Sequence, residues 1–172
     1  MRHDPGTDGL ALDSLKIEKL DLPTATKTLL VSEGLPHVDE LGLTFLAEDG
    51  TFPTLNAICA KKDWPPAREG DTLYRIGESD SYQICLTMGE GTVVAIEVGD
   101  AGERKFVNSS LALFLNCLEL CSSFYSQIED LDEDAIPGMA ERTAIALTQI
   151  DVAAAFSEQS WWGPEIDELG LL

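Results

Sequence analysis

The chain has 172 residues, of which 44% are hydrophobic, and it carries 11 Lys and Arg against 31 Asp and Glu, a formal net charge of −20. This length and apolar content suffice for the core of one ordinary domain. Such a charge repels phosphate backbones and anionic headgroups, so direct binding to nucleic acid or to an acidic membrane is disfavoured. A basic protein partner would be attracted and oriented during encounter. Acidity also serves solubility, so charge alone names no partner.

The sequence predicts a cytoplasmic protein. No stretch approaches the roughly 20 apolar residues that span a bilayer. Residues 1–9 contain a basic residue without an apolar run behind it, which is not typical of a signal peptide. We expect residues 1–9 to form a flexible N-terminal tail, because they are rich in turn formers, and residues 10–172 to form a single domain.

The cysteines are expected to be reduced core residues. All four lie among apolar neighbours, and none belongs to a Cys-x-x-Cys pair of the redox or zinc-binding kind. They are Cys59, Cys85, Cys117 and Cys121.

The first half of the chain predicts a helix followed by short strands. A helix is expected over Thr24–Glu33, because Gly34 and Pro36 form a stop signal behind it. Leu43–Leu46 and Leu55–Ala60 are candidates for strands at the edge of a sheet.

From residue 73 to residue 107, short β-like runs alternate with glycine turns. Breaks are expected at Gly77, at 89–91 and at 99–102. Consecutive runs of this kind are typical of an antiparallel meander. The predicted strands are Tyr74–Ile76, Tyr82–Met88, Thr92–Val98 and Arg104–Val107.

The remainder of the chain has helical patterns. Asn108-Ser109-Ser110 offers capping side chains directly before the apolar run Leu111–Cys121. Apolar residues occupy nearly the whole circumference of this run, so the helix should lie buried across the sheet. A second helix is expected over Gly138–Ile150, and Asp151 is expected to cap a third that runs through Ala155. A final short helix is expected from Pro164, because proline is favoured at a first helical position. The pattern as a whole predicts an α+β fold, a central antiparallel β-sheet with flanking helices.

Few residues offer chemistry. The histidines are His3, within the expected tail, and His37, after a helix stop, and there is no phosphate-binding glycine loop or nucleophile elbow. We therefore expect no enzyme activity, and assign no catalytic residue, no cofactor and no metal ligand. Trp161 and Trp162 are either an exposed interaction site or the residues that pack the C-terminal segment onto the body, and packing is the commoner role.

One acidic segment partly matches a calcium-binding loop. Positions 1, 3, 5 and 12 of such a loop are filled by Asp130, Asp132, Asp134 and Glu141. The sixth position requires glycine but is Ala135, and Pro137 takes the eighth, so the backbone opposes calcium binding. The alternatives are a solvated connection between helices or a contact patch for a basic partner. A metal-dependent enzyme using this segment is the weakest hypothesis.

The segment from Tyr82 to Leu118, and above all its Phe-Val-Asn-Ser-Ser stretch followed by leucines and Phe114, resembles the signature of the SUKH superfamily, closest to its fourth subgroup. The likeness extends to Gly34-Leu35-Pro36 and, loosely, to most of residues 24–170. The resemblance implies an α+β fold. It also implies an immunity protein that binds and neutralises a toxin domain of a polymorphic secretion system, often a nuclease. Other members are regulatory proteins that act through protein interaction.

The leading hypothesis is therefore an immunity protein that occludes a basic cognate toxin, and the alternative is a regulatory adaptor of the same fold. From Phe106 onward twelve acidic residues stand against Arg142 alone, so this part contributes −11 of the net charge. Its densest run is the predicted docking patch for a basic partner. This patch consists of Glu129, Asp130, Asp132, Glu133 and Asp134.

Overall fold

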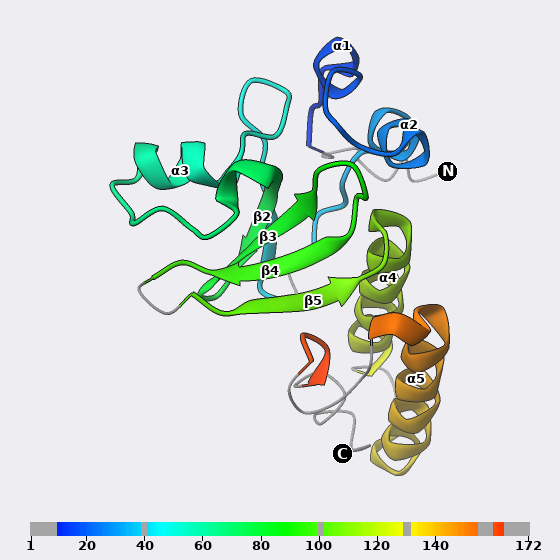
Figure 1. Cartoon of the computed structure of the whole chain (residues 1–172). Helices are drawn as coiled ribbons and strands as arrows, with labels where there is room; N and C mark the ends of the chain where they lie inside the picture. Colours follow the sequence, from blue (N-terminus) through cyan, green and yellow to red (C-terminus); the bar gives the residue numbers. More distant parts are fainter. Residues whose placement is uncertain (1–9, 39–40, 100–101, 129–131, 155–159, 164–172) are drawn as a thin grey trace.

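A computed structural model describes residues 10–38, 41–99, 102–128, 132–154 and 160–163 (Figure 1). Five strands form one antiparallel sheet in the order β1-β2-β3-β4-β5, so each strand pairs with the next one along the chain. The predicted meander and the α+β class are confirmed. The strands are β1 (Leu43–Phe45), β2 (Leu73–Ser79), β3 (Tyr82–Thr87), β4 (Val93–Glu97) and β5 (Arg104–Asn108).

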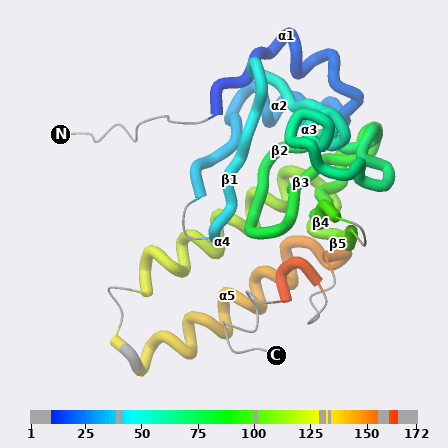
Figure 2. The backbone as a smooth tube through the Cα atoms, turned by 90° about the vertical axis from the view of Figure 1, so that its left-hand side faces the viewer, coloured from blue at the N-terminus to red at the C-terminus, as the bar shows by residue number. Residues whose placement is uncertain are grey.

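Helices flank the sheet, with α3 and the pair α4 and α5 on different sides (Figures 1 and 2). The expected first helix is present as α2, and the expected helix from residue 138 begins two residues earlier as α5. The helix predicted from Pro164 and the tail predicted over residues 1–9 lie outside the described residues. The helices are α1 (Ser14–Ile17), α2 (Thr24–Ser32), α3 (Leu55–Lys61), η1 (Gly70–Thr72), α4 (Leu111–Ile128), η2 (Glu133–Ala135), α5 (Ile136–Ile150) and η3 (Val152–Ala154).

The sheet buries apolar side chains on both faces. Along β3, Ile84 and Leu86 belong to the larger core beneath α4, whereas Cys85 between them packs with Leu55 and Cys59 of α3. Successive residues of a strand point to opposite faces, so a continuous apolar run fits a strand covered on both sides. The α3 face is the smaller core and leaves part of β4 and β5 uncovered by a helix.

The helix α4 forms the centre of the larger core, as predicted. Its buried residues are Leu111, Phe114, Cys117, Leu118, Cys121 and Phe124. By length and composition it is also the one helix in the described ranges that could cross a membrane, which the sequence pattern did not predict. Its packing against the sheet and α5 is that of a core helix. The Phe114 ring meets the Phe45 ring of β1 edge-on and lies against the Trp162 ring at a tilt.

The interpretation of Leu55–Ala60 as a strand is wrong. The segment forms α3, which begins after Thr54, whose Oγ1 accepts a hydrogen bond of 3.3 Å from the Ala57 backbone N–H. Leu55, Ile58 and Cys59 are buried together. Residues spaced three and four apart lie on one face of a helix. In so short an apolar run, hydrophobicity alone cannot distinguish a helix from a strand.

The predicted break at Gly77 is also wrong, because β2 continues through this residue to Ser79. A Cβ atom at position 77 would lie 2.6 Å from the Thr44 carbonyl oxygen, so glycine permits β1 to approach closely. The pairing of β2 with β3 shifts register between Arg75 and Gly77, as at a β-bulge. The chain turns instead after Ser79, at Asp80, which has a φ of 48°.

A buried polar cluster joins the end of β5 to the C-terminal part of the chain. The Asp151 carboxylate accepts hydrogen bonds from the Ser109 backbone N–H at 2.6 Å, the Ser109 hydroxyl at 2.9 Å and the Asn108 amide at 3.1 Å. It also accepts from the Ala153 backbone N–H at 3.1 Å, so it caps η3 as predicted. Trp162 Nε1 donates to Asn108 Oδ1 at 3.1 Å. The cluster therefore ties three distant segments together.

Burial and hydrogen bonding act against each other on the Asp151 carboxyl. Burial raises its pKa. The hydrogen bonds from Ser109, Asn108 and Ala153 lower the pKa by more than burial raises it, so the net pKa is below the ordinary value. Asp151 is only 4% exposed to solvent. The ionised form is thus the one the fold stabilises.

All four cysteines are buried and none of them is in a disulfide, as expected for reduced core thiols. Burial raises the pKa of the Cys85 thiol to about 12 and that of Cys117 to about 11. Thiolate at these two residues is therefore scarce at neutral pH in the folded protein.

The thiols should be inert toward Ellman's reagent at pH 8 in the native protein and react fully after unfolding in guanidinium chloride. For Cys85, a pKa near 12 in place of 9.0 lowers the thiolate fraction roughly a thousandfold, and burial restricts access as well. Labelling of Cys85 within minutes under native conditions, located by mass spectrometry, would contradict its place between α3 and the sheet.

Replacing Asp151 with Asn should lower the free energy of unfolding by roughly 2–4 kcal/mol at pH 7, because an amide cannot accept from all its buried donors. The folded pKa of Asp151 is depressed, so the stability that its ionised form contributes is complete above about pH 4 and is lost as the pH falls through the lower folded value. The difference between wild type and Asp151→Asn should therefore shrink in acid.

Urea unfolding of both proteins at pH 7, 5, 4 and 3 measures this difference. The control is Asp71→Asn, which removes one exposed carboxylate from η1. A difference between wild type and Asp151→Asn that stays constant from pH 7 to pH 3 would reject the role assigned to the ionised carboxylate.

Candidate functional site

The described part of the predicted docking patch lies at the end of the α4–α5 pair farthest from the sheet, just before α5 begins (Figure 2). Asp132 and Asp134 are exposed there, and the backbone of Glu133 lies in η2. Glu129 and Asp130 lie outside the described residues. The described part of the patch thus places carboxylates at the tip of a helical pair.

The same segment lacks the backbone of a calcium loop. Ile136, at the seventh position of the possible loop, is the first residue of α5, so its carbonyl points along the helix toward the next turn. Pro137 and Glu141 follow within the same helix, and Asp130 lies outside the described residues. In the part of the chain that the structure describes, no group of three or more His, Cys, Asp and Glu residues could hold a metal ion.

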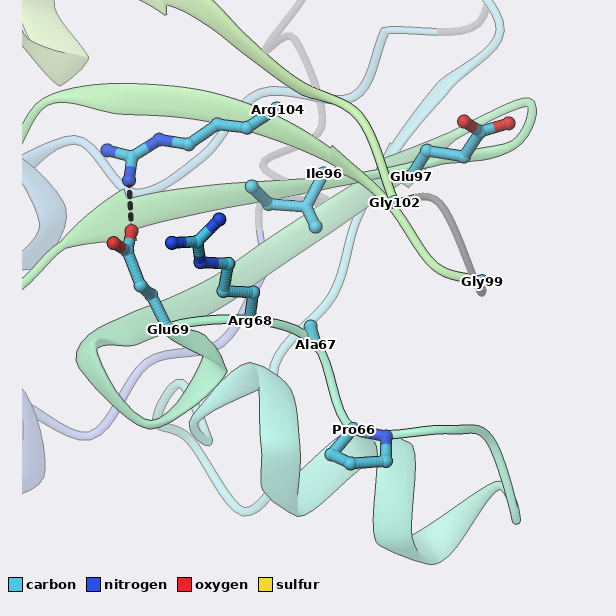
Figure 3. A pocket seen from close by; sticks show the side chains of 9 residues that line it. All are labelled: Pro66, Ala67, Arg68, Glu69, Ile96, Glu97, Gly99, Gly102 and Arg104. Atoms are coloured by element: carbon cyan, nitrogen blue, oxygen red, sulfur yellow. Dashed lines mark hydrogen bonds and ion pairs between the residues drawn. The ribbon is translucent and has the colours of Figure 1, made fainter.

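A cavity of about 650 Å³ lies beside the uncovered part of the α3 face, between the loop after α3 and the β4–β5 hairpin (Figure 3). Across it, Arg104 of β5 forms an ion pair with Glu69. The Arg68 side chain lies beside this pair and near Ile96, and has no ion-pair partner among the described residues. The lining residues are Pro66, Ala67, Arg68, Glu69, Ile96, Glu97, Gly99, Gly102 and Arg104.

The loop that carries Arg68 is held in place from α3. Asn56 Oδ1 accepts a hydrogen bond of 2.9 Å from the Ala67 backbone N–H, and a Cβ atom at Gly70 would collide with the same oxygen at 2.3 Å. Glu69 has a φ of 63°, a conformation that non-glycine residues seldom adopt. Arginines and glutamates balance in this cavity, so it is close to neutral in a strongly acidic protein. The sequence did not indicate it, because no motif joins residue 68 to residue 104.

A second cavity, of about 730 Å³, is a groove between α2 and α4. We call it the α2–α4 groove. The Gly-Leu-Pro segment noted in the sequence borders it, with Pro36 exposed and Leu35 buried beneath. Its lining residues are Leu29, Glu33, Gly34, Pro36, His37, Val38, Ala112, Leu115, Asn116, Leu118, Glu119, Ser122, Ser123 and Ser126.

The tryptophans are not an exposed interaction site. Trp162 is 1% exposed and forms part of the core. Trp161 is half-buried and stacks edge-on against Tyr82 of β3, with ring centroids 5.6 Å apart. Packing of the C-terminal segment onto the body is therefore confirmed for the described residues.

The segment that carries the family resemblance is mostly interior. Asn108 is fully buried and holds Asp151 and Trp162, and Leu111 and Phe114 are fully buried in the core. Ser110 caps α4, since its Oγ accepts a hydrogen bond of 3.3 Å from the Leu113 backbone N–H. These residues determine the fold, and the exposed cavities lie elsewhere.

Among curated proteins and among solved structures, none matches the chain. The family model described as SUKH-4 immunity protein matches residues 6–168, which includes every described helix and strand. The chain therefore belongs to the SUKH-4 immunity protein family.

Proposed function

We propose that this protein is the immunity partner of a polymorphic toxin and neutralises it by direct, stoichiometric binding that occludes the toxin's active site. The observation that carries the proposal is the family match over residues 6–168, because membership supports an immunity role. Binding requires no chemistry of the immunity protein itself, and the described residues supply surfaces rather than a metal cluster.

The proposed partner is a basic protein. A nuclease must be positively charged where it holds phosphate, and a surface with a net charge of −20 complements it. The charge is distributed unevenly, since the part from Phe106 onward has twelve acidic residues and one basic residue. Oppositely charged partners associate faster and in a preferred orientation. We therefore propose that the C-terminal helices and their connection face the toxin.

We place the action of the protein in the cytoplasm. Its four cysteines are buried and none is in a disulfide, as is usual for proteins of a reducing compartment. A toxin that attacks nucleic acid would meet its immunity protein in the same compartment.

Coexpression tests the immunity role directly. The domain to test is the C-terminal domain of a secreted protein encoded by a gene that neighbours the gene for this chain. Cells that express that domain should stop growing, and coexpression of this protein should restore growth, with a 1:1 complex in size-exclusion chromatography. The catalytically inactive toxin domain should form the same complex. Growth arrest that persists, with no complex, would reject the immunity role and favour the regulatory adaptor.

The docking patch has its own test. Changing Glu129, Asp130, Asp132, Glu133 and Asp134 to the corresponding amides should slow association with the toxin domain about tenfold and flatten its dependence on salt, because exposed charges act mainly on encounter and are screened over about 10 Å at 0.1 M salt. Stability should change little. Stopped-flow fluorescence from 25 to 500 mM NaCl measures the rate.

The matched control removes the same charge elsewhere. It changes five exposed acids of the first hundred residues to amides, namely Glu18, Asp21, Asp63, Asp71 and Glu90. If both variants slow association equally, the toxin senses only net charge, and the patch has no special place in docking.

A further inference from the structure

One exposed side of α4 forms a wall of the α2–α4 groove. The α4 residues that line it are Ala112, Leu115, Asn116, Glu119, Ser122, Ser123 and Ser126, with Leu118 at its floor. Each lies three or four positions from another member of the set, so they form one stripe along the helix. The stripe spans fourteen steps of 1.5 Å, about 21 Å or four helical turns. The groove is thus long enough to receive a helix of comparable length.

The floor of the groove is apolar, and several short side chains line its α4 side. Val38 and Leu118 are buried at the floor, and Leu29 and Leu115 are partly buried on either side. The neighbouring α4 positions carry alanine and serine, whose short side chains allow another backbone to approach closely. A groove with these features fits an amphipathic helix that inserts its apolar residues.

Two carboxylates stand at the groove without a cation. Glu33, at the end of α2, and Glu119, on α4, are both exposed. Neither forms an ion pair with a residue that the structure describes, and none of the described residues that line the groove is Lys or Arg. An occupant with Lys or Arg beside its apolar residues would neutralise both carboxylates.

The chain itself is a poor source of such an occupant. Residues 164–172 contain three acids and no base, and residues 1–9 contain hardly any apolar side chain. A second copy would bring the same Glu33 and Glu119 and another charge of −20 to the interface. Like charges brought together oppose association.

We propose that the α2–α4 groove receives a basic amphipathic helix of the toxin, with apolar residues over Leu115 and Leu118 and Lys or Arg beside Glu33 and Glu119. This inference rests on the proposed function and names the surface through which it acts. The groove stripe ends at Ser126, close to the C-terminal end of α4 and the docking patch that follows it, so anchoring and electrostatic steering would use adjoining surfaces.

Filling the groove tests the proposal. Ala112 is exposed on α4, and Ala112→Arg would place a long cationic side chain in the groove without disturbing the core. The expected result is at least a tenfold loss of affinity for the catalytically inactive toxin domain in isothermal titration calorimetry, mostly through faster dissociation. Ala60→Arg is the matched control, because Ala60 is an exposed alanine on α3 and gains the same charge. A second variant, Glu33→Lys with Glu119→Lys, reverses both carboxylates and should weaken binding comparably.

Each outcome separates the groove from the immunity role. Loss of affinity in Ala112→Arg and in the double variant, with Ala60→Arg unchanged and all melting temperatures close to wild type, supports the groove. Tight binding by every variant would overturn the groove and leave the immunity role intact. Loss confined to Ala60→Arg would overturn it as well and place the toxin on the α3 side, near the cavity of Figure 3. Absence of binding by the wild type would instead reject the proposed function.

Discussion

The arrangement of the C-terminal half depends on the hydrogen bonds that the buried Asp151 carboxylate accepts. It accepts hydrogen bonds from Ser109 and Asn108 at the end of β5 and from Ala153 in η3. Asn108 in turn accepts from Trp162. These bonds fix the return of the chain after α5, and so they hold the α4–α5 pair against the sheet. A buried carboxylate is costly unless such donors surround it, which is why the cluster forms as a unit.

The same cluster separates the residues that determine the fold from those that face a partner. The signature stretch through Asn108 and Phe114 lies in the interior, whereas the grooves and acidic surface use exposed residues such as Ala112 and Glu119 of the same helix. One side of α4 therefore builds the core, and the other is available for binding. A family of immunity proteins can in this way keep one framework while the exposed side of the helix suits a particular toxin.

Much of the fold followed from local pattern, and the errors came from one run too short to interpret and from contacts between residues distant in sequence. Glycine-punctuated apolar runs predicted the meander, and capping residues before Leu111 predicted where α4 begins. The run from Leu55 was too short to separate helix from strand, and Gly77 serves a neighbouring strand rather than a turn. Asp151 was identified as a helix cap, but its bonds to Ser109 join residues 42 positions apart, which no local pattern reveals.

The surfaces were harder to predict than the core for the same reason. The acidic run near Asp132 is contiguous in sequence, so it was visible, whereas the α2–α4 groove joins Glu33 to Glu119 only through packing of two helices. Hydrogen–deuterium exchange of the protein with and without its toxin domain tests the whole account most directly. Binding should protect residues 29–38 and 112–126, and leave α3 unchanged. Protection confined to α3 and β5, or none at all, would contradict it.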